Sequence, residues 1–444
     1  MGNRKIFIQI ASYRDPQLLP TIKDAIDKAK HPENLVFSIT WQHSKDDLWD
    51  DLSEFKNDDR FRILDVDYKD SQGACWARNA LQQQYVDEEY TLQLDSHHRF
   101  IQNWDSECIK MVKQLQKKGH AKPLLTGYIS SFDPENDPAG REMKPWKMNF
   151  DRFIPEGAVF FLPATIDNYL ELTEPIPARF YSAHFCFTLG SFVKEVPHDP
   201  EFYFHGEEIS VGVRAYTWGY DLFHPHKIIA WHEYTRKGRT KQWDDDPEWA
   251  RRNSYCHKKN RQLFGMDGEI RDKDFGIYDF GNVRSLREYE KYAGISFARR
   301  AITQSTMDNK VAPNPPCTDQ EFDDSLMSIF KHCIDIVPQQ VAPSLFTDQS
   351  IYNHPEDVRN ALIREIIRPY LNDCDFWVVA FENKLGETIY RKDVDKAELQ
   401  GFLNDQDGYY KIWRTFNASE KPAKWVVWVY NNTQGWGERI TGNL

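Results

Sequence analysis

The sequence contains neither a long apolar run nor a pair of closely spaced cysteines. No stretch approaches the roughly 20 apolar residues that a membrane-spanning helix needs. The apolar part of the opening MGNRKIFIQI is too short for a signal peptide. The seven cysteines include no Cys-x-x-Cys pair, which argues against a disulfide scaffold and a zinc ribbon. We therefore expect a soluble, reduced, cytoplasmic chain without a transmembrane segment, peripheral to a membrane only through a partner.

Positive charge is also in deficit. The net charge of −12 disfavours a nucleic-acid backbone as the main partner. An acidic protein can still bind a nucleotide diphosphate when a divalent metal supplies the missing positive charge. Repeats and low-complexity tracts are absent, and the 40% of hydrophobic residues supports a folded core rather than disorder.

The first hundred residues alternate between short apolar runs and helical patterns. Strands are expected at 5–10, 35–41, 61–66 and 90–94, with helices at 18–29 and 74–85. This alternation predicts a mostly parallel sheet covered by helices. Ligands of such sheets bind beyond the carboxyl ends of the strands, where the polar residues 12–15 and 95–97 stand.

The character of the chain changes after residue 304. Before it, we expect a helix at 103–118, strands at 123–131, 157–162, 182–190 and 226–231, and a helix at 206–217. The proline-containing stretch 305–317 is typical of a linker. Helical patterns follow at 318–335 and 355–371, then β-like runs at 374–382, 386–391, 409–416 and 424–430. The predicted organisation is a catalytic domain at 1–304, a linker at 305–317, and a helical segment plus a small β-rich accessory domain at 318–444.

The segment LQLDSHHRF at 92–100 carries the strongest local signal. An apolar strand ends abruptly in Asp95-Ser96-His97. Side chains at i and i+2 of an extended segment point to the same side, so Asp95 and His97 can bind one divalent ion. The alternative is a strand-end aspartate that caps a helix, with His97 and His98 on the surface.

A second constellation lies within residues 202–236. Glu207 and Glu208 begin a helix after a glycine, and His232 follows an apolar strand. A third ligand such as His232 would complete a metal's protein shell while leaving positions open for phosphate oxygens and water. His224 and His226 are rivals for this role, and an acidic pair at a helix start also occurs without any catalytic function.

A third candidate is the segment SQGACWARN at 71–79. Small residues such as Gly73 before a helix allow a ligand to approach backbone N–H groups closely. Arg78 could contact a phosphate or orient a carboxylate. The alternative for Arg78 is a salt bridge on an exposed helix face.

Six segments together resemble a known family. They are IASYRD at 10–15, DSQGACWARN at 70–79, LQLDSHHRF at 92–100, FHGEEISVGVRAYTWGYD at 204–221, WHEYTR at 231–236 and GNVRSLREYEKYAGISF at 281–297. The set resembles the N-acetylglucosaminyltransferase (GlcNAc) family typified by the cytoplasmic enzyme that modifies hydroxyproline on a ubiquitin-ligase adaptor. It is more distantly similar to the polypeptide N-acetylgalactosaminyltransferases.

The resemblance implies an α/β fold of the GT-A type, a Rossmann-like mixed sheet flanked by helices. It further implies a UDP-sugar donor, a Mn²⁺ or Mg²⁺ cofactor and retention of anomeric configuration. Metal ligation is expected from Asp95, His97 and His232, and catalytic roles from Glu207 and Glu208. Donor binding is expected from Ser12, Arg14, Gly73, Arg78, Asp95 and Ser96. One departure is His205, which stands where an acidic or small residue is expected.

The predicted function is metal-dependent transfer of a sugar, GlcNAc before GalNAc or galactose, from a UDP-sugar to a hydroxyl group. The acceptor is a glycan or a protein, and polysaccharide biosynthesis fits as well as protein modification. A metal-dependent hydrolase is one alternative, but it usually needs a second metal site, which the sequence does not suggest. A glycan-binding or scaffold protein with a degenerate transferase domain is another. The last third keeps it open, because its tryptophans form either a glycan platform or a core: Trp377, Trp413, Trp425, Trp428 and Trp436.

Overall fold

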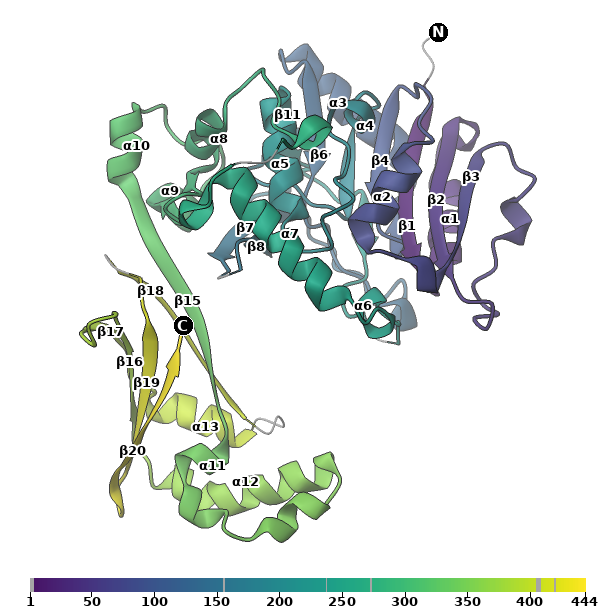
Figure 1. The fold of residues 1–444 in the computed structure, drawn as a ribbon. Helices are drawn as coiled ribbons and strands as arrows, with labels where there is room; N and C mark the ends of the chain where they lie inside the picture. Colours follow the sequence, from purple (N-terminus) through teal and green to yellow (C-terminus); the bar gives the residue numbers. More distant parts are fainter. Residues whose placement is uncertain (1–3, 155, 237, 272–273, 405–408, 419–420) are drawn as a thin grey trace. The chain divides into compact units, whose positions relative to one another are not determined.

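The computed structural model describes residues 4–444 except 155, 237, 272–273, 405–408 and 419–420. The chain divides into two compact units, Met1–Leu326 and Met327–Leu444 (Figure 1). The expected linker at 305–317 lies inside the first unit, and its role as a linker stays a prediction. Within the described residues, no helix combines the length and the apolar character needed to cross a membrane.

The first unit is built on an eight-stranded mixed sheet in the order β3-β2-β1-β4-β10-β6-β11-β9. The strands are β1 (Ile6–Tyr13), β2 (Leu35–His43), β3 (Phe61–Asp67), β4 (Tyr90–Leu94), β6 (Lys122–Thr126), β9 (Ile176–Pro177), β10 (Phe185–Leu189) and β11 (Tyr220–His224). Strands β3, β2, β1 and β4 run parallel, as do β6 and β11. Strand β10 is antiparallel to both of its neighbours, β4 and β6. This helix-flanked mixed sheet confirms the expected α/β architecture of the GT-A type.

Helices cover the sheet on both faces. The longer ones are α1 (Leu18–Lys28), α2 (Ala74–Gln82), α3 (Trp104–Lys117), α5 (Glu207–Thr217), α7 (Trp249–Phe264) and α8 (Leu286–Ala293). Short helices are α4 (Phe192–Glu195), α6 (Gln242–Asp245), α9 (Gln304–Met307) and α10 (Asp319–Ser325). Strands β1 and β2 are buried along nearly their whole length, as expected for parallel strands covered on both faces.

Helix α3 shows how the sequence directs this packing. Its buried apolar side chains recur at the spacing of one helix face and join the main core: Trp104, Cys108, Met111, Val112 and Leu115. Burial of each such side chain stabilises the fold by about 1.5–3 kcal/mol. The opposite face of α3 is polar and rich in lysine.

Three small antiparallel pairs complete the first unit. They are β5 (His98–Phe100) with β12 (Ala230–His232), β7 (Trp146–Phe153) with β8 (Val159–Thr165), and β13 (Ile295–Ser296) with β14 (Ala301–Thr303). The β5–β12 pair places His232 directly opposite His98. Because His98 follows the Asp95–His97 motif immediately, this pairing brings a segment far along the chain to that motif.

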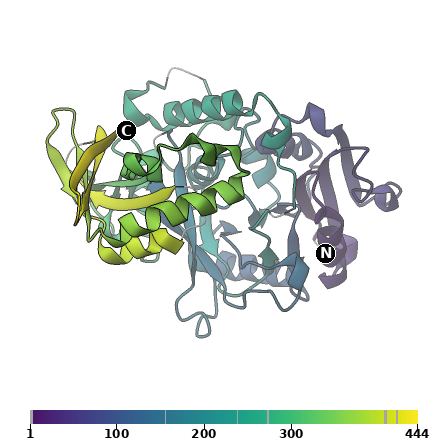
Figure 2. The same ribbon diagram turned by 90° about the horizontal axis from the view of Figure 1, so that it is seen from below.

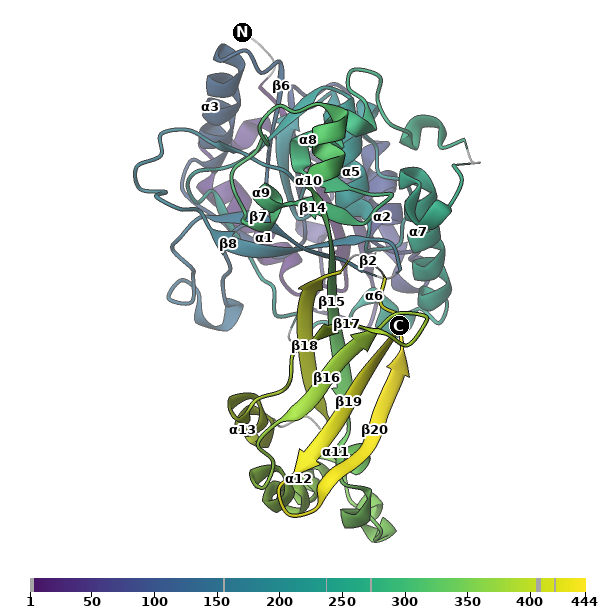
Figure 3. The same cartoon turned by 90° about the vertical axis from the view of Figure 1, so that its left-hand side faces the viewer.

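The second unit contains an antiparallel sheet in the order β17-β16-β19-β20 (Figure 3). Its elements are β15 (Leu326–Ile336), α11 (Pro338–Val341), α12 (Glu356–Asn372), β16 (Trp377–Glu382), β17 (Thr388–Arg391), α13 (Lys396–Asn404), β18 (Tyr410–Asn417), β19 (Lys424–Asn431) and β20 (Gly435–Asn443). Strand β15 pairs with β18, and helices α12 and α13 lie side by side (Figure 2). The four expected β-like runs are confirmed as β16 to β19, whereas β20 was not expected.

The expected helix at 318–335 was wrong in its second half. Helix α10 ends at Ser325, and Leu326–Ile336 form strand β15. The apolar residues of this stretch fit either period, but they include several β-branched and aromatic side chains, which favour a strand. Pairing with β18, from Phe330↔Phe416 to Ile336↔Tyr410, decides the outcome.

Candidate active site

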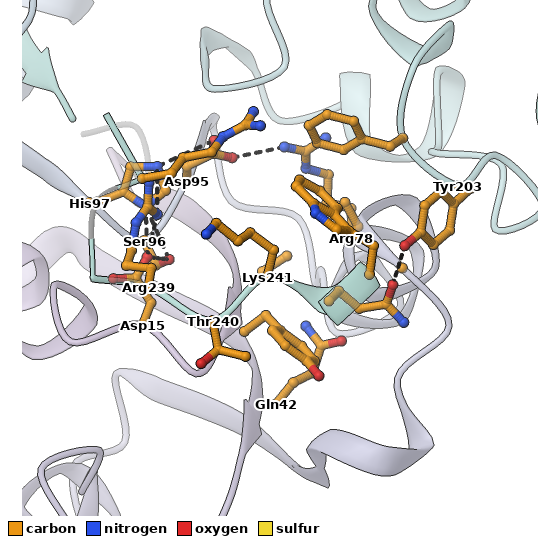
Figure 4. Close-up of a pocket in the computed structure, with 18 of the residues that line it drawn as sticks. Asp15, Gln42, Arg78, Asp95, Ser96, His97, Tyr203, Arg239, Thr240 and Lys241 are labelled. Carbon is orange, nitrogen blue, oxygen red and sulfur yellow. Dashed lines mark hydrogen bonds and ion pairs between the residues drawn. The ribbon is translucent and has the colours of Figure 1, made fainter. Parts of the chain in front are cut away.

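A pocket of about 170 Å³ opens at the carboxyl ends of β1 and β4, at the edge of the sheet where the sequence predicts a ligand. Its walls come from the ends of β1 and β2, the start of α2, the residues 95–97 and the segment 239–243 (Figure 4). The pocket therefore brings together segments that lie far apart in the sequence, from residue 11 to residue 243.

Asp95, His97 and His232 converge at this pocket. One ligand atom from each lies within 4.8 Å of the others. The Oδ2 atom of Asp95 is 3.7 Å from Nε2 of His97 and 3.4 Å from Nε2 of His232. Both histidines are buried, so the alternative of a surface histidine at position 97 does not describe the structure.

The three residues fit a divalent ion. Neither ring nitrogen of His232 has a hydrogen-bond partner among the described residues, although buried polar groups nearly always have one. Burial, together with the neighbouring His184, holds the pKa of His232 well below its usual range, so its ring is in the neutral form that binds metals. A set of one carboxylate and two imidazoles suits a divalent cation.

Arg78 orients the carboxylate of Asp95. Its Nη2 atom donates a hydrogen bond of 2.8 Å to Oδ1 of Asp95, which leaves Oδ2 facing the two imidazoles. Burial opposes ionisation of Asp95, but His232 and Arg78 hold its pKa well below the usual range. Arg78 is itself buried, so it does not form the exposed salt bridge that was its alternative role.

Gly73 shapes the pocket wall where α2 begins. It is the residue before the helix and has a φ of +110°, a conformation that only glycine adopts readily. A Cβ atom at this position would lie 2.7 Å from Cδ2 of Tyr203, another wall residue. The glycine therefore permits both the turn and the close approach of the tyrosine ring.

The remaining predicted donor-binding residues differ in their placement. Ser96 lines the pocket, and its hydroxyl donates a 2.7 Å hydrogen bond to Oδ2 of Asp15. The side chain of Ser12 is fully buried and is not among the residues that line the pocket. Arg14 lies outside the pocket lining, where Asp47 and Asp245 engage its guanidinium. The structure thus brings Ser96, but neither Ser12 nor Arg14, to the cavity.

The two rivals of His232 lie away from the group. Nδ1 of His224 donates to the carbonyl of Thr126 at 2.8 Å, and its Nε2 is 3.4 Å from the backbone N of Met148. His226 is buried elsewhere and does not line the pocket. Of the three candidates, only His232 stands beside Asp95.

Asp15 and Arg239 extend the site beyond the predicted set. Nδ1 of His97 donates to Oδ2 of Asp15 at 2.7 Å. This contact leaves Nε2 of His97 unprotonated on the side of Asp95, the usual arrangement of a histidine that binds a metal. Arg239 pairs with Asp15 at 2.9 Å and with Glu233 at 2.7 Å. The sequence flagged Asp15 only as part of a polar strand end and gave no signal for Arg239.

The segment that follows His232 brings positive charge to the pocket. Arg236, Arg239 and Lys241 all line it, together with the aromatic Trp243. The Nη1 atom of Arg239 lies 2.6 Å from Nδ1 of His97. This acidic protein therefore gathers cationic side chains at the pocket, where they could bind an anion.

Glu207 and Glu208 border an adjoining cavity of about 230 Å³, which also touches Arg78, Asp95 and His232. Oε1 of Glu208 accepts from the backbone N–H of Ala183, and Oε2 accepts from the hydroxyl of Tyr128, each at 2.9 Å. Burial raises the pKa of both glutamates, and the charge of Glu208 raises that of Glu207 further. The pair therefore carries less than two full negative charges near neutral pH.

Comparison with solved structures finds similar chains with low sequence identity. The chain is similar to GalNAc-T7 with UDP, GalNAc and Mn²⁺, at 14% identity and a TM-score of 0.44, over 64% of this chain and 54% of that one. It is also similar to S. aureus TarS 1–349 in complex with UDP-GlcNAc, at 13% identity and a TM-score of 0.38, over 83% and 86% of the two chains. This chain thus spans about half the length of the GalNAc-T7 chain.

Comparison of sequences gives a more direct assignment. No curated protein matches the chain significantly. A family model described as Glycosyltransferase (GlcNAc) matches residues 5–53 and 50–299. These residues contain the whole pocket and make up most of the chain. The chain belongs to this glycosyltransferase family.

Proposed function

We propose that this glycosyltransferase is metal-dependent and transfers GlcNAc from UDP-GlcNAc, with retention of configuration, to a hydroxyl group of a glycan or a protein. One observation carries the proposal. Oδ2 of Asp95 and the Nε2 atoms of His97 and His232 converge beside a pocket lined with cations. No second group of this kind occurs among the residues that the structure describes, which disfavours a two-metal hydrolase.

In this proposal Asp95, His97 and His232 hold a Mn²⁺ or Mg²⁺ ion. The bound ion supplies positive charge to the donor phosphates and so stabilises the leaving UDP. Arg239, which contacts His97, and Lys241 bind phosphate oxygens of the donor. Gln42 and Tyr203 line the part of the pocket farther from Asp95 (Figure 4), where we place the nucleoside.

The adjoining cavity is the proposed site of the transferred sugar and the acceptor. Glu208 is held in place by Ala183 and Tyr128, so it can orient a sugar or acceptor hydroxyl. Glu207 lies 3.7 Å from the guanidinium of Arg78. It borders the same cavity, so it can contact the same hydroxyl groups. The acceptor oxygen bonds to the anomeric carbon as the bond to the leaving phosphate breaks. A phosphate oxygen of the donor takes the acceptor's proton, so the reaction requires no protein base.

The description of the matching family supports GlcNAc as the transferred sugar. GalNAc and galactose differ from it by a hydroxyl orientation or an N-acetyl group, which a few contacts in the cavity would distinguish. His205, which also lines this cavity, is one residue that could read the difference. The cavity is compatible with a hydroxyl of a growing polysaccharide and with one of a protein side chain.

The test is UDP release from a panel of UDP-sugars, with and without Mn²⁺. We expect slow, Mn²⁺-dependent hydrolysis of UDP-GlcNAc by the wild type and none by Asp95→Ala. Asp59→Ala, which removes an exposed aspartate that does not line the pocket, should behave as the wild type. Release from another sugar alone would correct the donor. Glycan binding without any release, and without Mn²⁺-dependent UDP binding, would overturn the proposal in favour of a binding protein.

A further inference from the structure

A groove, separate from the donor pocket, lies at the opposite edge of the sheet. Its volume is about 600 Å³, and it is bordered by the start of β1, the turn after α1 and the polar face of α3. Strand β1 begins at this groove with Ile6 and ends at the pocket with Tyr13. In Figure 1, α3 accordingly lies at the top of the first unit and α6, beside the pocket, at its bottom.

The groove concentrates positive charge in an acidic protein. Five of its lining residues are cationic: Arg4, Lys30, Lys110, Lys113 and Lys117. Most arginine and lysine side chains of the first unit form ion pairs, whereas the structure gives none of these five a carboxylate partner within 4 Å among the described residues. Among the described residues, no direct ion pair therefore offsets the mutual repulsion of these five charges.

The carboxylates near the groove are engaged by other groups. Asp105 lines it, but this side chain is buried and its two oxygens accept the backbone N–H groups of Lys30 and His31 at 2.8 and 3.0 Å. Glu107 is paired with Lys227, and Glu174 with Lys118. Asp105 thus holds the turn after α1 in place and offsets only one of the five positive charges.

The lysines of α3 are spaced to meet an extended ligand. Lys110, Lys113 and Lys117 recur at intervals of three and four residues, so they form a row along one face of the helix. The row spans about 10 Å, because the helix rises 1.5 Å per residue. A single phosphate is too small to contact both ends of this row. A ligand with two or more anionic groups along its length would contact all three lysines.

We infer that this groove is a binding site for an oligoanion that carries several phosphate groups. Lysine ammonium groups bind phosphate as point charges and tolerate a range of ligand geometries. The concave shape favours a discrete ligand that enters the groove. Such a ligand comes either from a soluble oligophosphate or from the clustered headgroups of anionic lipids. In both cases, the ligand binds at the opposite edge of the sheet from the donor pocket.

The test is calorimetric titration with inorganic tripolyphosphate at about 50 mM salt, where charge interactions are weakly screened. The donor pocket is also cationic, so the measurement is a comparison of the wild type with the triple variant Lys110→Gln, Lys113→Gln and Lys117→Gln. We expect tripolyphosphate to bind one of its sites in the variant at least about tenfold more weakly than in the wild type. A titration identical to that of the wild type would overturn the proposal.

Two controls separate the groove from other effects of charge. The variant Lys56→Gln, Lys144→Gln and Lys258→Gln removes the same charge from exposed positions outside the groove and should titrate as the wild type. Mn²⁺-dependent UDP binding reports on the donor pocket alone and should be unchanged in both triple variants. If the groove lysines only solvate the surface, both triple variants would weaken tripolyphosphate binding equally, which would also overturn the proposal.

Thermal unfolding provides an independent measurement. Without ligand, the groove variant should be at least as stable as the wild type, because it relieves repulsion. With tripolyphosphate, the Tm of the wild type should rise more than that of the variant, since a ligand stabilises the state that binds it. Vesicles of phosphatidylglycerol and of phosphatidylcholine then identify the source. Binding to the anionic vesicles that is lost in the groove variant indicates lipid headgroups, and tripolyphosphate binding alone indicates a soluble oligophosphate.

Discussion

Arg78 and Asp95 form a partly buried pair in which the guanidinium donates a 2.8 Å hydrogen bond to Oδ1 of the carboxylate. The bond fixes the direction of Oδ2, the oxygen nearest to His97 and His232. Arg78→Lys keeps the charge but loses the planar, branched donor. We expect Mn²⁺ affinity to fall by about 10- to 100-fold, as is usual when a residue that orients a metal ligand is replaced.

Titration of Mn²⁺ by its paramagnetic resonance signal measures this change directly. Arg251→Lys is the matched control, because Arg251 is exposed and pairs with Glu248 on its own helix turn rather than with a residue of the pocket. Unchanged Mn²⁺ affinity in Arg78→Lys would show that Asp95 needs no such support. Equal losses in both variants would point to a general effect of the substitution.

Glu207 makes stability depend on pH in a direction opposite to most carboxylates. Its pKa is raised in the folded protein, so the folded state binds the proton more tightly than the unfolded state does. The stability that Glu207 contributes is therefore present below its ordinary pKa and is lost as the pH rises through the raised value. Glu207→Gln has no charge to bury and should be more stable than the wild type at about pH 8, but not at about pH 5.

Chemical denaturation of the metal-free protein at both pH values tests this expectation. The control is Glu33→Gln, which removes an exposed carboxylate. A Glu207→Gln variant that is less stable than the wild type by the same amount at both pH values would contradict a raised pKa. The same variant should also have reduced transfer activity, because the proposed orientation of acceptor hydroxyls needs the carboxylate.

The tryptophans of the second unit divide between core and surface. Trp377 is fully buried in the core of that unit, whereas 44% of Trp436 is exposed. We expect Trp377→Ala to lower the free energy of unfolding by about 3–5 kcal/mol. Trp436→Ala removes a ring that lies tilted against Trp428 and should cost less than about 1 kcal/mol. Chemical denaturation of the full chain measures the free energy of unfolding of both variants. Equal losses would contradict the assignment of Trp377 to the core and Trp436 to the surface.

Gly73 offers a test of the pocket wall. Gly73→Ala places a methyl group against Tyr203 and imposes a φ of +110° on a residue that resists it. Strain of this kind costs about 1–3 kcal/mol, and displacement of Tyr203 should weaken UDP binding. Gly401→Ala is the control, because no neighbouring atom of the described residues lies within 4 Å of an added Cβ there. Wild-type UDP affinity in Gly73→Ala would show that Tyr203 does not shape the nucleotide site.

Much of the fold was predictable because its elements carry local signals. The expected strand at 90–94 coincides with β4, and the helix patterns at 18–29 and 103–118 differ from α1 and α3 by a residue or so at each end. The antiparallel insertion of β10 between β4 and β6 could not be predicted. The partners of a strand depend on long-range packing. A short apolar run predicts a strand but neither its neighbours nor its orientation in the sheet.

The candidate site was predictable to a similar degree. Asp95 and His97 stand two residues apart between β4 and β5, so their proximity was predictable from their spacing, and the family resemblance favoured His232. Arg239 comes from a polar loop with no periodic pattern, and only the folded chain brings it to Asp15. The placement of Ser12 depends on which face of β1 it occupies, and that face is set by the neighbouring strands.

The antiparallel strand β10 also determines when the pocket can exist. Strand β10 fills the gap between β4 and β6 and comes from a later part of the chain than either. A chain emerging from the ribosome therefore keeps both strand edges open until residue 189 has been made, and it lacks His232 and Arg239 for longer still. The nascent protein can neither complete its sheet nor bind a donor until most of the first unit has been synthesised.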